Sequence, residues 1–318
     1  MSNHPIELAL PDIRKYRDGN TGTPYVHRTD SGKPGPNVMI NALTHGNEVC
    51  GAIALEALLD LKLAPRIGTL TMSFANVEAY QSFDPANPNA SRFVDQDFNR
   101  VWSAAVLDDL GRESSELRRA RALRPFVDEA DLLLDLHSMQ EMSPPLGLSG
   151  PRDKGIALAL AVGAPQHIVV DAGHAEGVRM RDYAGFGDEA SSKNALLVEC
   201  GQHWEASSAD VAKDSLARFL IHSGLAVASD LPAEWLRPQR LPQKIVRVTE
   251  AIVATSADFR FAGAYTGLEE FPQAGTVIAW RDGVPIHTPY PNCVLVMPSI
   301  RHLRPGVTAV RLGRLVNA

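Results

Sequence analysis

Short apolar runs alternate with helix-patterned segments along most of the chain, and this alternation constrains the fold more than any other feature. The runs typical of buried strands are residues 37–43, 69–75, 131–136, 167–171 and 195–199. Apolar residues recur at helical spacing in residues 49–61, 113–130, 155–162 and 208–223. Strands that alternate with helices favour an α/β fold, with a mostly parallel or mixed sheet flanked by helices on both faces.

Two segments add to this pattern. Residues 24–28 and 37–43 both have strand character and flank the turn-rich segment 31–36, which predicts a hairpin-like pair. Residues 80–100 form a long polar stretch that contains two prolines. Because a loop of this length inside a compact domain is more often functional than idle, we expect it to contribute to a site.

The composition changes near residues 231–243, where three prolines each follow a leucine or an arginine. The rest of the chain is β-rich, with glycine and proline turns. A chain of 318 residues is long enough for two units that each have a core. We therefore predict a catalytic domain over residues 1–235 and a smaller β-rich C-terminal domain over residues 236–318.

Charge and hydropathy exclude several classes of protein. The formal net charge of −6 argues against a nucleic-acid partner, because such proteins usually present a basic face. No apolar run approaches the roughly 20 residues that span a bilayer, and the N-terminus lacks the pattern of a secretory signal. Three widely spaced cysteines favour reduced thiols. These features predict a cytoplasmic protein with no membrane partner, and they leave open a homo-oligomer.

Two histidines and a glutamate have the spacing of a catalytic metal site. His45 and Glu48 lie three residues apart in a glycine-containing loop after a predicted strand, and His137 directly follows another strand. In a parallel sheet, ligands bind where the carboxyl ends of the strands meet. Two histidines and a glutamate are an established ligand set for catalytic zinc. Asp135 could orient His137 through a hydrogen bond. Read alone, His137 would more often be a buried core histidine.

Four further residues offer the chemistry that such a site needs. Glu199 ends an apolar run, where burial would raise its pKa toward that of a general base. Arg92 and Arg100 lie in the long polar stretch, and guanidinium groups bind carboxylates or stabilise an oxyanion. Asn99 would add orientation. The ordinary alternatives are a buried salt bridge for Glu199 and surface charges for the arginines.

In chain order these residues form a set of motifs. They are His45-Gly46-Asn47-Glu48, Arg92, Asp97-Phe98-Asn99-Arg100, Asp135-Leu136-His137-Ser138 and Glu199, over about residues 38–203. The set resembles the succinylglutamate desuccinylase/aspartoacylase family, within the wider zinc carboxypeptidase-like (M14) group. The resemblance implies one Zn²⁺ per chain, held by His45, Glu48 and His137.

The resemblance also implies roles for the other motif residues. Glu199 would be the general base, and Arg92 would polarise the scissile carbonyl. Asn99 and Arg100 would hold a substrate carboxylate. A second domain in such proteins usually narrows the entrance, which favours small acylated amino acids over peptides.

The chain departs from the family pattern in ways that bear on the substrate. Phe98 stands where the family often has leucine, and the arginine and tyrosine that precede the base in aspartoacylases have no match at the same spacing. The C-terminal tyrosine of aspartoacylase also lacks a clear match. Candidate residues for these contacts are Arg179, Arg181, Tyr183, His174 and His203 and, in the C-terminal part, Tyr290, Arg301 and His302.

We therefore expect zinc-dependent hydrolysis of the amide bond of a small N-acyl amino acid or a related carboxylate-bearing amide. Two alternatives stay open: a metallocarboxypeptidase that acts on short peptides, and a non-catalytic zinc-binding protein of the same fold. Imidazole and carboxylate ligands also suit other divalent metals.

Overall fold

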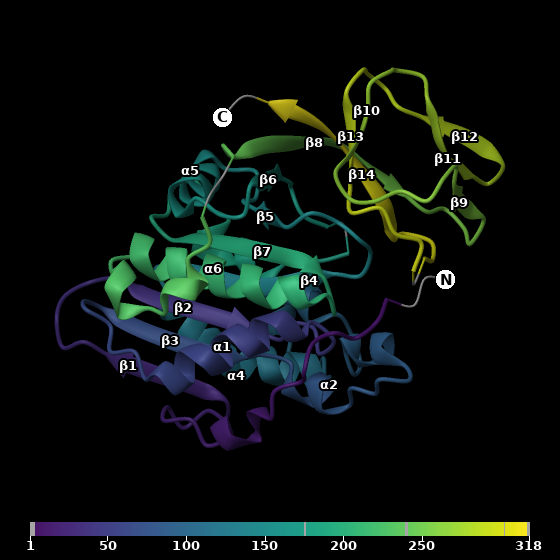
Figure 1. The fold of residues 1–318 in the computed structure, drawn as a ribbon. Coiled ribbons are helices and arrows are strands. Elements are labelled where there is room, and N and C mark those ends of the chain that lie inside the picture. The colour runs from purple at the N-terminus through teal and green to yellow at the C-terminus, as the bar shows by residue number, and fades with distance from the viewer. Residues whose placement is uncertain (1–3, 175, 239–240, 302, 317–318) are drawn as a thin grey trace.

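The computed structural model describes residues 4–174, 176–238, 241–301 and 303–316. Its strands are β1 (Val26–Asp30), β2 (Asn37–Ala42), β3 (Thr69–Phe74), β4 (Leu132–Met139), β5 (Leu146–Leu148), β6 (His167–Val170), β7 (Asn194–Gln202), β8 (Lys244–Val253), β9 (Phe259–Phe261), β10 (Glu269–Phe271), β11 (Val277–Arg281), β12 (Val284–His287), β13 (Cys293–Val296) and β14 (Thr308–Val316). Within these described ranges, eleven strands form one sheet in the order β1-β3-β2-β4-β7-β5-β6-β8-β14-β13-β10 (Figure 1).

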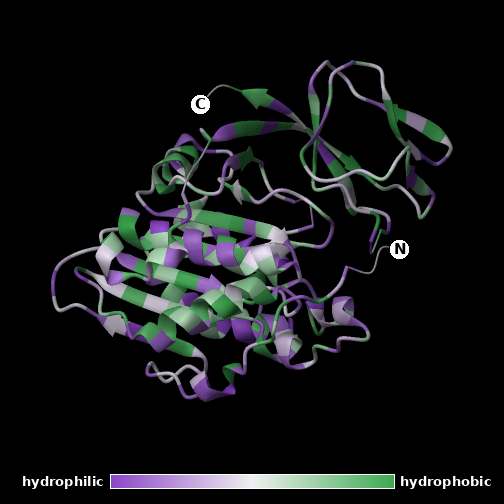
Figure 2. Ribbon diagram, in the orientation of Figure 1, coloured by the Kyte–Doolittle hydropathy of each residue, from purple (hydrophilic) through white to green (hydrophobic). Residues whose placement is uncertain are grey.

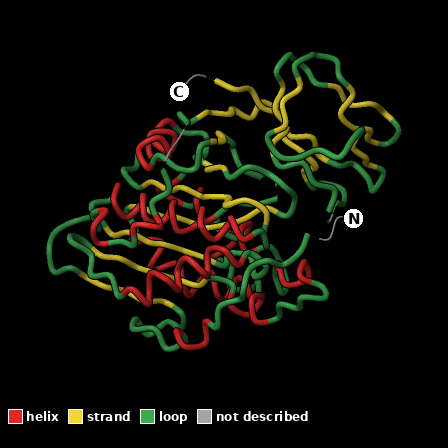
Figure 3. The backbone as a smooth tube through the Cα atoms, in the orientation of Figure 1, coloured by secondary structure: helices red, strands yellow, loops and turns green. Residues whose placement is uncertain are grey.

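Helices cover both faces of this sheet (Figure 3). On one face α1 (Val49–Leu61), α5 (Asp153–Val162) and α6 (Ala206–His222) share an apolar core with the strands. On the other face α4 (Ser115–Glu129) packs over a second core. Figure 2 shows hydrophobic residues along the central strands, which are buried on both sides. The α/β fold with flanking helices is confirmed.

The centre of the sheet is parallel, and this brings the predicted site together. Strand β2 pairs in parallel with β3 and β4, and β4 pairs in parallel with β7. The carboxyl ends of these strands therefore lie at one edge, where the loop after β2 and the last residues of β4 and β7 meet.

The predicted hairpin is wrong. Strand β1 pairs antiparallel with β3, whereas β2 lies between β3 and β4. Burial explains the difference: β2 is buried along nearly all of its length and needs a neighbour on each side, whereas β1 is mostly half-buried and suits an edge.

The polar stretch 80–100 is more ordered than a simple loop. It begins within α2 (Val77–Gln81) and contains two 3-10 helices, Pro88–Arg92 and Phe98–Arg100. A further short helix, α3 (Ala104–Leu107), follows. The side chains of Asp84 and Asp97 accept hydrogen bonds from backbone N–H groups two residues further along the chain, which favours such turns.

The C-terminal part is β-rich, as predicted. Strand β8 pairs in parallel with β6 and so extends the main sheet, and β14, β13 and β10 follow antiparallel. Strands β9, β11 and β12 form a separate small sheet. A domain boundary at residue 235 stays a prediction. None of the helices in the described part of the chain combines the length and the hydropathy needed to span a bilayer.

Candidate active site

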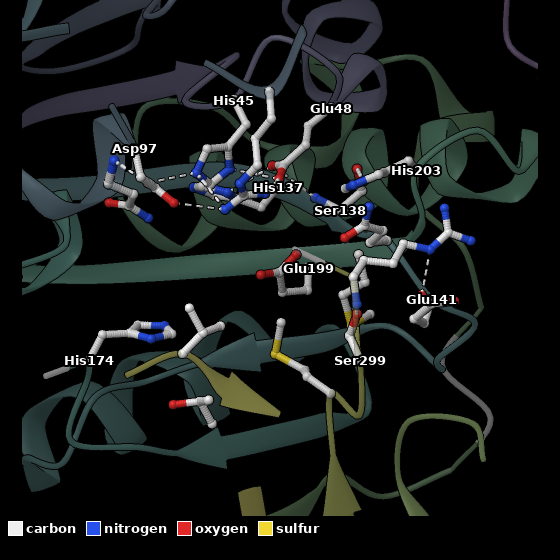
Figure 4. A pocket seen from close by; sticks show the side chains of 18 of the residues that line it. His45, Glu48, Asp97, His137, Ser138, Glu141, His174, Glu199, His203 and Ser299 are labelled. Atoms are coloured by element: carbon white, nitrogen blue, oxygen red, sulfur yellow. Dashed lines mark hydrogen bonds and ion pairs between the residues drawn. The ribbon is translucent and has the colours of Figure 1, made fainter. Parts of the chain in front are cut away.

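His45, Glu48 and His137 converge at the carboxyl edge of the sheet (Figure 4). His45 lies in the loop after β2, Glu48 is the N-cap residue of α1, and His137 lies near the end of β4. Nδ1 of His45 is 2.7 Å from Oε1 of Glu48, and Nδ1 of His137 is 2.8 Å from Oε2. The three ligand atoms lie within 4.8 Å of one another, and all three side chains are buried.

Asp135 orients the imidazole of His137. Nε2 of His137 donates to Oδ2 of Asp135 at 2.7 Å, which turns Nδ1 of the ring toward Glu48. The other oxygen of Asp135 accepts hydrogen bonds of 2.8 Å from Asn41 and Thr44. This network holds the ring in the orientation that a metal ligand requires.

The electrostatics of the three residues suit a shared cation. Burial would raise the pKa of Glu48, but His45 and His137 hold it well below its usual range. Burial likewise opposes protonation of His137, but Asp135 and Glu48 raise its pKa well above the ordinary value. Two imidazole nitrogens and a carboxylate that face one another at hydrogen-bond distance form a donor set that could hold a metal ion.

Glu199 lies beside this set on β7, where it is the register neighbour of His137. It is 6% exposed, and its Oε2 is buried without a hydrogen-bond partner among the described residues. Burial raises the pKa of Glu199 to about 8. The ordinary alternative, a buried salt bridge, is not formed within the part of the chain that the structure describes.

Arg92 extends from the polar stretch to His45 and Glu48. Its Nη2 is 3.0 Å from Oδ2 of Asp97 and 2.9 Å from Nε2 of His45. Its Nη1 is 3.5 Å from Oε1 of Glu48. Asp97 in turn lies 3.0 Å from Nε2 of His45, so a carboxylate and a guanidinium meet on the outer side of that imidazole.

Asn99 and Arg100 line the same pocket. The amide oxygen of Asn99 accepts a 2.8 Å hydrogen bond from the backbone N–H of Met180, so its NH₂ group is the end left to donate. Arg100 donates to the backbone oxygen of Asn99 at 2.8 Å and lies 3.9 Å from Asp97. Its Nε is buried without a hydrogen-bond partner among the described residues.

A carboxylate at the start of α4 organises the segment before these residues. Glu116 is fully buried and accepts hydrogen bonds from the backbone N–H groups of Val94, Asp95 and Gln96 at 2.7, 3.1 and 3.2 Å. Sequence reasoning missed this role. The available signal was an acidic residue in the first turn of a predicted helix, which more often only favours the helix dipole.

The pocket has a volume of about 720 Å³ and is lined by all seven residues singled out from the sequence. Of the additional candidates, those that also line it are His174, Arg179, His203 and Arg301. Those that do not are Arg181, Tyr183 and Tyr290. Arg181 instead bonds to the backbone oxygens of Ser149 and Ala195, both at 2.8 Å. His302 lies outside the described residues.

Arg311 also lines the pocket, and sequence reasoning missed it. It lies on β14, where its Nε is 3.3 Å from Asp171 and its Nη2 is 3.0 Å from Nδ1 of His174. Arg179 pairs with the same Asp171 at 3.2 Å. The available signal was an arginine between apolar residues of a strand, where a charge needs a partner.

Comparison with known proteins agrees with this geometry. The model of the succinylglutamate desuccinylase/aspartoacylase catalytic domain matches residues 34–223. A curated relative, a probable aspartoacylase from Parasynechococcus marenigrum, is 34% identical over 134 residues. That match covers 40% of this chain and spans 42% of the relative's length.

Solved structures share the fold. A succinylglutamate desuccinylase from Vibrio parahaemolyticus has a TM-score of 0.65 at 18% identity, over 92% of this chain and 87% of that chain. One from Chromobacterium violaceum has a TM-score of 0.65 at 15% identity, over 93% and 90%. The ectoine utilization protein EutE (DoeB) from Ruegeria pomeroyi has a TM-score of 0.61 at 17% identity, over 91% and 88%. Since the family model matches more than half of the chain, the chain belongs to the succinylglutamate desuccinylase/aspartoacylase family.

Proposed function

We propose that this chain is a zinc-dependent amidohydrolase that cleaves the amide bond of small N-acyl amino acids. The observation that carries the proposal is the buried set of His45, Glu48 and His137, which opens on the same pocket as Glu199. Zinc held by these three residues would polarise the scissile carbonyl and lower the pKa of water toward 7.

Glu199 is the general base in this proposal. Its carboxylate accepts a proton from the attacking water and then gives that proton to the leaving amine. A pKa of about 8, raised by burial, makes the carboxyl able to hold and release a proton near neutral pH.

The polar stretch supplies orientation and charge. Arg92 lies beside the metal ligands and donates to the oxyanion that develops on the substrate. Asn99 and Arg100 bind the carboxylate of the amino acid, and this fixes the position of the carbonyl relative to Glu199.

The test is the variant Glu199→Gln, which keeps the shape of the side chain and removes the base. We expect the variant to retain zinc and to lose about 10²–10⁴-fold in turnover. Amine release from N-acetyl, N-formyl and N-succinyl amino acids measures the activity, and metal analysis of the purified protein measures the zinc.

The matched control is Glu189→Gln, because Glu189 is exposed and does not line the pocket. This control should keep both zinc and turnover. Loss of zinc in Glu199→Gln would make Glu199 a ligand, and unchanged turnover would remove it as the base. Absence of chelator-sensitive release by the wild-type protein across the panel would contradict the proposed function.

A further inference from the structure

One side of the pocket is apolar, and the proposed chemistry does not use it. Its residues are Met139 at the end of β4, Leu148 in β5, Leu197 in β7 and Met297 after β13. We call these four residues the methionine–leucine wall. They belong to one packed apolar cluster, which also contains residues of β6, β8 and β13.

The wall is adjacent to the reacting groups. Leu197 lies two residues before Glu199 on β7, so both side chains are on the same face of the strand. Leu148 is the register neighbour of Leu197 on the adjoining strand β5. An apolar surface therefore begins directly beside the predicted general base.

The wall lies away from the predicted carboxylate contacts. In Figure 4, Asp97 and Ser299 lie on opposite sides of Glu199. Met297 is two residues from Ser299, and Asn99 and Arg100 closely follow Asp97. With the carboxylate at Asn99 and Arg100 and the carbonyl at the metal ligands, the acyl group extends toward the wall.

Met297 is held in this position by an unusual backbone conformation. Its φ is +52°, in the left-handed region that residues other than glycine rarely adopt. Its side chain lines the pocket and packs against the apolar cluster. Backbone strain of this kind persists where the surroundings fix it, often at ligand sites.

Two charges near the wall, Glu141 and Arg301, are paired with each other. Glu141 follows Met139, and Arg301 follows Met297, within four residues in each case. Nε of Arg301 donates to Oε1 of Glu141 at 2.7 Å, so the two charges offset one another. Arg311, the register neighbour of Val296, lies 3.3 Å from Asp171. With these charges paired, the apolar side chains of the wall suit a hydrocarbon more than a charged acyl chain.

We propose that the methionine–leucine wall binds the acyl chain, and that the preferred substrates are N-acyl amino acids with an apolar acyl group longer than acetyl. The inference rests on the proposed function, since it takes the scissile carbonyl to lie at the metal ligands. Thioether side chains adapt to chains of different shape, which suits alkyl and aryl groups alike.

The experiment uses the full-length, zinc-loaded protein and one amino acid carrying acetyl, butanoyl, hexanoyl, octanoyl, benzoyl or succinyl groups. We expect kcat/KM to rise along the linear series by up to about fourfold per buried methylene. Inhibition by free acetate, hexanoate and octanoate measures acyl binding without turnover, and the inhibition constant should fall with chain length.

The variant Met297→Asn removes the apolar side chain and keeps a residue that tolerates a positive φ. The octanoyl-to-acetyl ratio of kcat/KM should fall at least tenfold. The matched control is Val284→Asn, because Val284 is exposed on β12 and does not line the pocket. That control should keep the wild-type ratio. If Met297→Asn does not fold, the wild-type inhibition series still decides the point.

The outcomes separate the two proposals. Cleavage that is fastest for acetyl or succinyl, or flat along the series, overturns the acyl-chain inference and leaves the amidohydrolase intact. Chain-length preference that survives Met297→Asn shows that another surface binds the chain and also overturns it. No cleavage of any member of the series contradicts the proposed function and the inference together.

Discussion

At the scale of single residues, the site depends on carboxylates whose surroundings give them different states. Asp135 is fully buried and accepts three hydrogen bonds, one of which comes from the imidazole of His137. The imidazoles of His45 and His137 hold the pKa of Glu48 well below its usual range. Glu199 is buried, and one of its oxygens has no hydrogen-bond partner among the described residues. Burial raises its pKa to about 8. Three carboxylates in one site can therefore serve as orienting group, ligand and base.

The raised pKa of Glu199 predicts how stability depends on pH in the zinc-free protein. The folded-state pKa is about 8 and the ordinary value is 4.5, so the unfolded state ionises first as the pH rises. The free energy of unfolding therefore falls by roughly 3–5 kcal/mol as the pH rises from about 4.5 to about 8. Glu199→Gln removes this loss, so the variant should melt higher than the wild type at pH 8 and close to it at pH 4.5.

Thermal melts of both zinc-free proteins across this pH range test the prediction. The comparison uses the difference between the two melting temperatures, because other titrating groups affect both proteins alike. A difference that stays constant with pH would show that folding does not raise the pKa of Glu199.

Sequence could identify site residues that lie at strand ends or in the motif, but not those that depend on long-range pairing. All seven predicted residues line one pocket. His45, Glu48, His137 and Glu199 lie there because parallel strands bring their carboxyl ends to one edge, and the other three lie in the polar stretch that carries the motif. Arg311 reaches the pocket only because β14 pairs with β8, and β8 with β6. No local pattern shows that pairing. The roles of these residues stay predictions until variants are measured.

At the scale of elements, the start of α4 holds the segment that leads to Asp97, Asn99 and Arg100. Ser114 caps the helix by accepting from the N–H of Leu117 at 3.0 Å. Glu116, in the first turn, binds three consecutive backbone N–H groups of the preceding segment. The helix therefore acts as a support for the predicted substrate contacts.

The variant Glu116→Ala should lower stability by roughly 2–3 kcal/mol, because three backbone N–H groups lose their acceptor. It should also raise KM, because the segment that leads to Asn99 and Arg100 loses its support. The zinc content should change little, because His45, Glu48 and His137 lie on other elements. Glu113→Ala is the matched control, because Glu113 is exposed and precedes the same cap. Denaturant unfolding, steady-state kinetics and metal analysis distinguish the effects. Unchanged KM would show that the segment holds its shape without the carboxylate.

The elements also show which part of the fold sequence patterns could specify. Helices α1, α4, α5 and α6 match the predicted ranges within a few residues, because their apolar spacing is local. The prediction that β1 pairs with β2 is wrong, because strand character alone does not determine which neighbour a strand pairs with. Burial along β2, visible only in the fold, decides that pairing.

At the scale of the whole molecule, the set of His45, Glu48 and His137 joins the loop and helix after β2 to β4 in the centre of the sheet. The same sheet continues through β6 and β8 into the C-terminal strands. An ion at this position would therefore cross-link elements that lie about 90 residues apart in sequence, as the contact between Glu48 and Ser138 illustrates. Metal binding and the stability of the fold should be coupled.

Removal of zinc should therefore lower the melting temperature of the whole chain as well as its activity. At a free zinc concentration 1,000 times the dissociation constant, the ion would contribute about 4 kcal/mol to the folded state. For a chain of this size that corresponds to a fall of roughly 8 °C or less on chelation. His137→Ala, which lacks one ligand, should show little response to chelator or to added zinc. Equal chelator responses in the two proteins would place the bound ion elsewhere, whereas a response confined to the wild type would tie stability and the His45–Glu48–His137 set to the same ion.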